Sequence, residues 1–266
     1  MRTFTLSSAL AALPLLAAIP AIAQTPSGAD SRFTVEIEGG SVWQSRNVAR
    51  IPGDTGTYID LKGLAGSGPE GFYRITATGR VRHRQELRAV WAPLRLKGTG
   101  VLGGPAESGD ETFTGIVDFD GETFETGVAT EATYQFNSPR LTYRWLVRDG
   151  ARDRFYVGVT ALVRDAEIRL AQPGVSASNT NVGFVPLLHL AGENRFGERW
   201  RLVYELDGLA APQGRAFDFS LRGLYDIDQD WYVGAGYRTI EGGADNDRVF
   251  NFAWLNFATV NVGYRF

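Results

Sequence analysis

Apolar and polar residues alternate with a two-residue period along most of the chain after residue 31. This is the period of a β-strand whose two faces meet different surroundings. The last segment shows it most clearly, because one face is apolar and only Asn256 interrupts it. That face holds Phe250, Phe252, Trp254, Ala258, Val260, Val262, Tyr264 and Phe266. The pattern predicts an all-β chain.

Ten segments of this kind predict ten strands. They lie at about residues 32–44, 71–82, 86–98, 131–148, 154–169, 180–192, 199–209, 214–226, 230–241 and 249–266. Short connections at 83–85, 149–153, 193–198 and 227–229 alternate with longer ones at 45–70, 99–130, 170–179 and 242–248; only 210–213 departs from this rule. An up-and-down antiparallel barrel with different ends has this arrangement. A hairpin at 112–126 would change the number of strands, so a barrel of eight or twelve strands is also possible.

Pro139 lies inside the predicted strand at 131–148. The apolar phase changes across it, from Tyr134 and Phe136 to Leu141 and Tyr143. Proline cannot donate to a sheet ladder and is confined to edges and bulges. We therefore expect a β-bulge at Pro139.

Residues 1–23 have the layout of a secretory signal peptide. Arg2 is followed by an apolar run at 9–21, and Ala21-Ile22-Ala23 forms a small-x-small cleavage site. The expected organisation is a signal peptide at 1–23, a short lead at 24–31 and one barrel domain at 32–266.

Composition narrows the possible chemistry. The chain has no Cys and two His, which excludes a disulfide scaffold, a Cys zinc site, a thiol nucleophile and a His-rich metal centre. Residues 24–266 carry 26 Lys and Arg against 30 Asp and Glu. This acidic balance argues against nucleic-acid partners. We expect no metal and no cofactor.

Alternation alone does not say which face of the barrel is outside. A soluble barrel has its apolar face inside, whereas a membrane barrel has it outside. Aromatic residues cluster at both strand ends, as they do at membrane interfaces. Near the long loops these are Trp43, Phe136 and Trp254, and near the short turns Trp145, Phe155, Trp200, Trp231, Tyr264 and Phe266. The unequal loops and the terminal Tyr-Arg-Phe also favour a transmembrane β-barrel.

Val260, Val262, Tyr264 and Phe266 form an alternating C-terminal pattern that ends in Phe. This pattern resembles the assembly signal of bacterial outer-membrane β-barrels, and the whole chain resembles the small OmpA/OmpW-type barrels. The resemblance implies the outer membrane of a Gram-negative bacterium. It also implies contact with outer-membrane lipid and lipopolysaccharide, and with periplasmic chaperones and the barrel-assembly machinery. We expect a monomer.

If the apolar face is outside, many charged residues face the lumen, and Arg dominates them. They are Glu36, Glu38, Arg74, Arg80, Arg88, Arg140, Arg144, Arg201, Glu205, Asp207, Asp218, Arg222, Arg238 and Arg265. Arg can bridge several carboxylates with its forked donors. The preferred interpretation is an ion-pair plug that closes the lumen, and the second is a narrow, anion-leaning pore.

The two histidines limit the catalytic possibilities. His83 lies in a predicted turn. His189 faces inward, and reflecting the hairpins about residues 196 and 212 pairs it with Val203 and places Glu205 and Ser220 at its level. These are the residue types of a nucleophile, a base and an orienter. Inward arginines are nearer partners for Glu205, however, and a filled lumen gives substrates no entry. We therefore expect no catalytic site.

The connection at 99–128 is acidic and has no Lys or Arg. It holds Glu107, Asp110, Glu111, Asp118, Asp120, Glu122 and Glu125. A solvated surface loop is the first interpretation, and divalent-cation binding or bridging to lipopolysaccharide is the second.

The function expected from these patterns is structural or adhesive at the cell surface, or that of a narrow channel, without enzyme activity. The alternatives are a barrel enzyme acting on lipid A or peptides, and a soluble periplasmic ligand-binding barrel.

Overall fold

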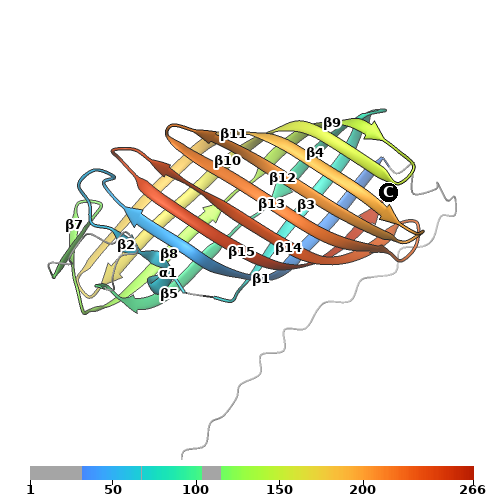
Figure 1. Cartoon of the computed structure of the whole chain (residues 1–266). Coiled ribbons are helices and arrows are strands. Elements are labelled where there is room, and N and C mark those ends of the chain that lie inside the picture. Colours follow the sequence, from blue (N-terminus) through green and yellow to red (C-terminus); the bar gives the residue numbers. More distant parts are fainter. Residues whose placement is uncertain (1–31, 67, 104–114) are drawn as a thin grey trace, which may run out of the picture.

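A computed structural model describes residues 32–66, 68–103 and 115–266. The expected signal peptide at 1–23, the lead at 24–31 and Glu107, Asp110 and Glu111 lie outside these residues. The described chain forms one closed antiparallel barrel (Figure 1). Its ten strands are β1 (Phe33–Arg50), β3 (Glu70–Arg82), β4 (Gln85–Trp91), β9 (Arg140–Asp149), β10 (Asp153–Gln172), β11 (Val175–Phe196), β12 (Trp200–Ala211), β13 (Gly214–Asp226), β14 (Trp231–Asp245) and β15 (Phe250–Arg265).

The ring closes because β1 pairs with β15, from Thr34↔Arg265 to Arg50↔Phe250. Strands follow one another around the ring in chain order, and β10 joins β11 over their full length. The predicted all-β, up-and-down barrel of about ten strands is therefore confirmed.

Two predicted strands are each divided into two pieces. β5 (Arg95–Val101) continues β4 after a break at Ala92–Leu94, and β8 (Ala129–Asn137) precedes β9 with a break at Ser138–Pro139. β8 pairs with β5 and with the second half of β10.

The expectation of a β-bulge at Pro139 rested on a change in which face of the strand points inward. The strand does not change its facing there. Even-numbered residues are buried on both sides, with Tyr134 4% exposed and Arg140 5% exposed. Phe136 packs inward against the apolar core and so does not join an outer aromatic girdle. What changes along the barrel is the chemistry of its interior.

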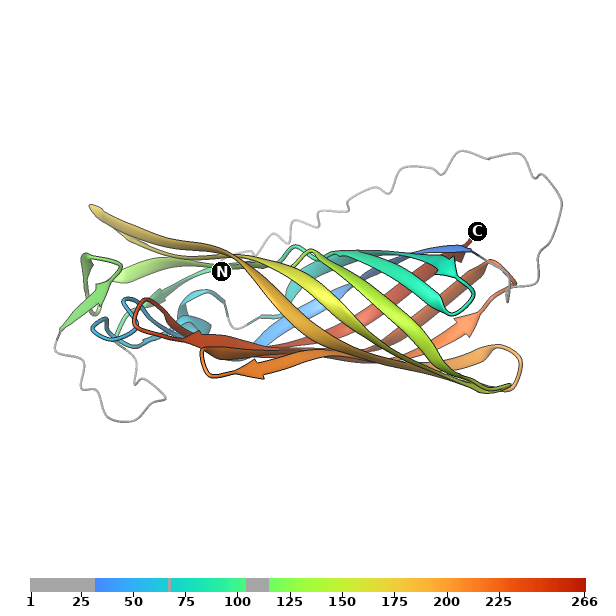
Figure 2. The ribbon, with the colours of Figure 1, turned by 90° about the horizontal axis from the view of Figure 1, so that it is seen from above.

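At the long-loop end the strands run further than predicted. β10 and β11 pair up to Gln172↔Val175 around a tight turn, in which Gly174 adopts φ +87°. β14 and β15 pair up to Asp245↔Phe250. The expected moderate loops at 170–179 and 242–248 are therefore mostly strand. Figure 2 shows the β10–β11 hairpin running far into the long-loop end, where β8 pairs with β10 up to Ala171↔Glu131.

The two long connections carry short elements of their own. β2 (Ile59–Asp60) and α1 (Leu61–Leu64) lie between β1 and β3, and β6 (Ile116–Phe119) pairs with β7 (Glu122–Glu125) in a separate sheet. The hairpin considered at 112–126 thus exists but adds no strand to the barrel. Within the described residues, no helix has the length and apolar character needed to cross a membrane.

These connections fold into the barrel mouth and form an apolar core there. Leu61 and Leu64 of α1 and Phe119 and Phe124 of the β6–β7 hairpin pack with inward residues of the wall, such as Leu255. Backbone hydrogen bonds tie the connections together, with Thr57 N donating to Asp118 O at 3.0 Å and Asp120 N to Ile51 O at 2.9 Å. This half of the interior holds an apolar core, beside which the buried Asn47 Nδ2 donates to Gln44 Oε1 at 2.7 Å.

The outer surface is apolar around the whole ring. Each of the ten strands exposes large apolar side chains, for example Ile37, Ile75, Leu87, Leu141, Val159, Leu190, Trp200, Leu221, Val233 and Val262. The facing predicted from the alternation therefore holds in the barrel wall, with apolar residues outside and charged residues inside the short-turn half.

Candidate functional site: a charged network across the lumen

Ten charged side chains meet inside the barrel, below the apolar core. We call them the central network: Glu36, Glu38, Arg74, Arg88, Arg140, Glu205, Asp207, Asp218, Arg222 and Arg238. None is more than 7% exposed. Five are arginines and five are carboxylates, so their formal charges cancel. Period-two alternation brings them together, because each sits on the inward face of its strand.

Asp218 on β13 binds three arginines. Its carboxylate oxygens lie 2.6 Å from Arg238 Nη1, 2.8 Å from Arg140 Nη1 and 3.3 Å from Arg74 Nη1. These arginines come from β14, β9 and β3, so a single carboxylate links opposite walls of the barrel. Charge-assisted hydrogen bonds of this kind are about twice as strong as neutral ones.

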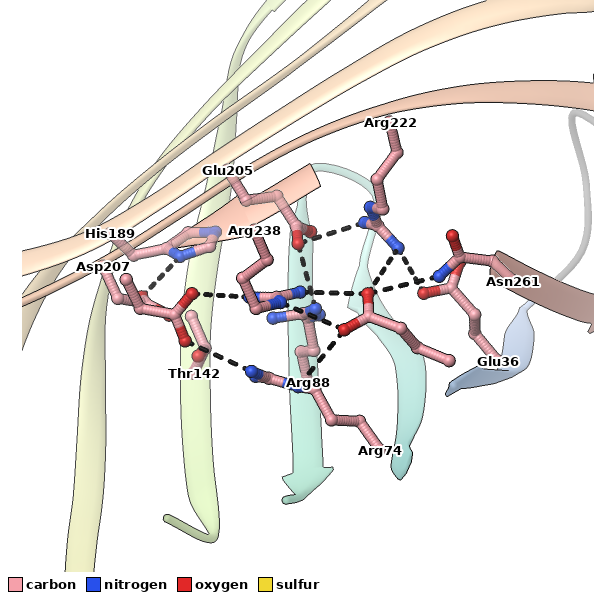
Figure 3. A network of polar contacts seen from close by, with 12 residues as sticks. Glu36, Arg74, Arg88, Thr142, His189, Glu205, Asp207, Arg222, Arg238 and Asn261 are labelled. Atoms are coloured by element: carbon pink, nitrogen blue, oxygen red, sulfur yellow. Dashed lines mark hydrogen bonds and ion pairs between the residues drawn. The ribbon is translucent and has the colours of Figure 1, made fainter. Parts of the chain in front are cut away.

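Glu205 on β12 forms a second crossing. Arg88 Nη2 and Arg222 Nη2 each lie 3.1 Å from its Oε2 (Figure 3). Arg88 belongs to β4, which is not a neighbour of β12 in the sheet. Arg222 also donates to Glu36, whose second oxygen accepts from Tyr232 Oη at 2.9 Å. The guanidinium groups of Arg88 and Arg222 therefore reach across the lumen between strands that are not neighbours.

Glu38 completes the network on the β1 side. Arg238 donates to it through Nε at 3.0 Å and Nη2 at 3.2 Å, and Asn261 Nδ2 donates at 3.2 Å. Asn261, which was not predicted as a site residue, is thus a neutral member of the network. An inward Asn opposite an inward Glu is the signal that would have identified it.

Asp207 holds the one buried histidine. Its Oδ1 accepts from Thr160 Oγ1 at 2.7 Å and lies 2.8 Å from His189 Nδ1, while Oδ2 lies 3.1 Å from Arg140 Nη1. Thr142 Oγ1 shares a 2.8 Å hydrogen bond with Thr160. His189 is thus satisfied on one side by the polar lumen.

The register expected for the Ser, His and Glu constellation is wrong. His189 pairs with Asp207 and not with Val203, because the hairpin is centred on residue 198 and closes with Phe196↔Trp200. Glu205 lies directly opposite Ser220, because the next hairpin is centred between residues 212 and 213. Within the described residues, His189 Nε2 and Ser220 Oγ have no hydrogen-bond partner. They therefore do not form the nucleophile–base hydrogen bond that catalysis by this constellation needs.

The remaining predicted lumen residues lie nearer the short turns. Arg144 binds Glu86 at 2.7 Å. Arg201 lies 2.8 Å from Asp226, which also binds Arg265. Arg80 is exposed at the rim and is not part of the central network.

Tyr232 organises this end of the lumen and was not predicted as a site residue. The Arg201 and Arg265 guanidinium carbons lie 4.9 and 4.8 Å from its ring centroid. Gly263 lies opposite Tyr232, and a Cβ there would sit 2.0 Å from the ring. The inward Tyr opposite an inward Gly is the sequence signal, because a side chain at 263 would exclude the ring.

The C-terminal residues Val260, Val262, Tyr264 and Phe266 face outward. Tyr264 stacks edge-on with Trp231 at 4.8 Å and with Phe266 at 4.6 Å between ring centroids, and Phe33 lies 5.7 Å from Phe266. The two ends of the barrel domain thus meet at the short-turn rim.

No protein-family model matches the chain, and no curated protein matches it. Among solved structures, outer membrane protease OmpT from Escherichia coli is similar over 91% of this chain and 99% of its own, with 9% identity and a TM-score of 0.49. The attachment invasion locus protein Ail of Yersinia pestis is similar over 88% of this chain and 99% of its own, with 10% identity and a TM-score of 0.38. The Pseudomonas putida toluene transporter TodX is similar over 88% of this chain and 90% of its own, with 9% identity and a TM-score of 0.32. Likenesses this distant establish no shared function. The barrel assignment itself rests on the strand pairing.

Proposed function

We propose that the protein is an integral outer-membrane β-barrel that does not conduct, and that its role at the cell surface is structural or adhesive. The observation that carries this proposal is the central network, whose buried ion pairs cross the lumen between opposite walls. The apolar core above the network fills the other half of the interior.

The outer surface supports a membrane environment. Exposed apolar side chains surround the ring, and water would disfavour so large an apolar belt. Pairing of β1 with β15 closes the ring of ten strands, and a sheet in hydrocarbon needs such closure. A soluble ligand-binding barrel needs the opposite arrangement, with charged side chains outside and an apolar interior throughout.

The two ends of the barrel support one orientation. The short turns and the termini of the barrel domain lie at one end, as in outer-membrane barrels whose short turns face the periplasm. α1, the β6–β7 hairpin and the β10–β11 hairpin lie at the other end (Figure 1). In this orientation the elaborated end faces the cell exterior.

The β10–β11 hairpin supports a surface role. β11 pairs with β12 only from Leu188 onward, so residues 175–187 bond to β10 alone among the described strands. Phe184 and Val182 on this segment are 69% and 71% exposed. A strand with an unpaired edge and exposed apolar side chains is suited to contact with other surface molecules.

An enzymatic role is not part of the proposal. His189 and Ser220 lie in the filled lumen, each less than 2% exposed. A lipid or peptide would have to displace the central network to reach them.

A liposome-swelling assay tests the closed lumen. The refolded chain is placed in vesicles, and an isosmotic solution of a small neutral sugar is added, with an open porin as the positive control. We expect swelling no faster than that of protein-free vesicles. Swelling that increases with the amount of folded barrel would refute a closed lumen and favour the narrow channel.

A further inference from the structure

A water-accessible cavity lies between the central network and the short-turn rim. Its volume is about 170 Å³, well above the ~10–15 Å³ that one water molecule needs. Glu205 and Arg222 of the central network form part of its inner wall, and Arg154 and Arg195 line it as well. Their side chains are 32% and 41% exposed, so the cavity communicates with solvent at this end.

The lining is strongly cationic. Eight arginines and four glutamates contribute to it. Two aspartates that bind lining arginines lie just outside, since Asp226 contacts Arg201 and Arg265 and Asp149 contacts Arg154. With both included, the residues named here comprise eight arginines and six carboxylates. The six other residues of the central network are three of each sign and do not change this excess.

Part of the cavity wall is held in place before any ligand binds. Arg201 is fixed by Asp226, by Glu193 at 3.0 Å and by the Tyr232 ring. Arg222 is 4% exposed, and its Nη atoms bind Glu36 and Glu205, so this part of the wall is fixed as well.

We propose that this cavity binds a compact multivalent oxyanion, a small solute with phosphate or carboxylate groups that enters from the short-turn end. Guanidinium forks match the oxygen geometry of both groups and bind them in pairs. A low-dielectric wall around a cationic cleft concentrates anions further. Binding here does not depend on the proposed surface role, because the cavity lies at the opposite end of the barrel.

Calorimetric titration of the full refolded chain with tripolyphosphate, in a neutral glycoside detergent at low salt, tests this site. We expect saturable binding with one site per barrel. The double variant Arg154→Gln, Arg195→Gln removes two partly exposed lining arginines outside the central network. It should weaken binding by about tenfold or more, because positive charges at the cavity rim attract an anion strongly at low ionic strength.

A matched control removes two arginines at the other end. Arg95→Gln, Arg215→Gln breaks two exposed ion pairs, with Glu167 and Glu241, and should leave the affinity unchanged. Citrate in place of tripolyphosphate separates carboxylate from phosphate ligands, and binding of either supports the proposal. Absence of saturable binding by both anions to the parent barrel, or equal loss in the two double variants, would overturn it.

Discussion

Neutralising Asp218 should destabilise the barrel far more than breaking an exposed ion pair. Asp218→Asn keeps the size of the side chain but removes the charge that three arginines share at 2.6 to 3.3 Å. Arg74, Arg140 and Arg238 would then remain buried with too little negative charge. Loss of one partner from a buried ion pair costs about 3–5 kcal/mol, because the other charge stays desolvated.

The same reasoning gives a coupling energy. In Arg238→Gln the carboxylates of Asp218 and Glu38 lose the nearer of two shared partners and keep only Arg74 in common. The double variant removes both members of the Arg238–Asp218 pair, so its cost should be smaller than the sum of the two single costs. We expect a coupling of about 1–3 kcal/mol, the range for residues in one network.

Urea unfolding in lipid vesicles, followed by the fluorescence of the six Trp residues, measures these free energies. Glu241→Gln is the matched control, because its pair with Arg215 is exposed and should contribute only about 0–1 kcal/mol. If Asp218→Asn costs no more than Glu241→Gln, water screens the network and the plug is refuted.

Three further changes test the wall of the barrel. Leu221→Arg puts a charge on the apolar outer face and should cost about 2–4 kcal/mol in vesicles near the bilayer midplane, whereas Ala210→Arg near a turn should cost little; equal costs in urea unfolding would contradict the membrane assignment. Phe266→Ala should slow assembly in cells, and heat-modifiable migration on a gel would report less folded barrel; an unchanged folded yield would show that the terminal pattern is incidental. Gly263→Ala places a Cβ 2.0 Å from the Tyr232 ring and should cost about 1–3 kcal/mol by overpacking, which a lowered urea midpoint would detect and an unchanged midpoint would contradict.

The barrel and the facing of its strands were predictable from the sequence because one physical rule governs both. Where the wall separates an apolar exterior from a charged lumen, alternation fixes which side chains point inward. Glu36, Glu205 and Asp218 were placed inside on this basis, and the structure brings them to the central network.

The apolar core at the long-loop end was not predictable in the same way. Ala253, Leu255 and Phe257 face inward, while Trp254 faces outward, so both faces are apolar there and the alternation disappears. The partners of these residues are supplied by α1 and the β6–β7 hairpin, which come from distant parts of the chain. No local pattern shows that such segments fold into the barrel mouth.

Partners within the lumen were also beyond the sequence. A shift of one or two residues in a hairpin changes which inward residues meet, and His189 therefore lies opposite Asp207 instead of Val203. Contacts such as Arg88 to Glu205 join strands that are not paired. Their selection depends on the curvature of the closed ring and the reach of Arg side chains, which alternation does not report.

The central claim is that the ion-paired lumen is closed, and single-channel recording of the unmutated barrel in a planar bilayer tests it most directly. Folded protein, verified by heat-modifiable migration, should insert without stepwise current at either polarity in concentrated salt. Uniform, ohmic current steps whose number increases with inserted protein would contradict the claim and show that the central network leaves a continuous water path.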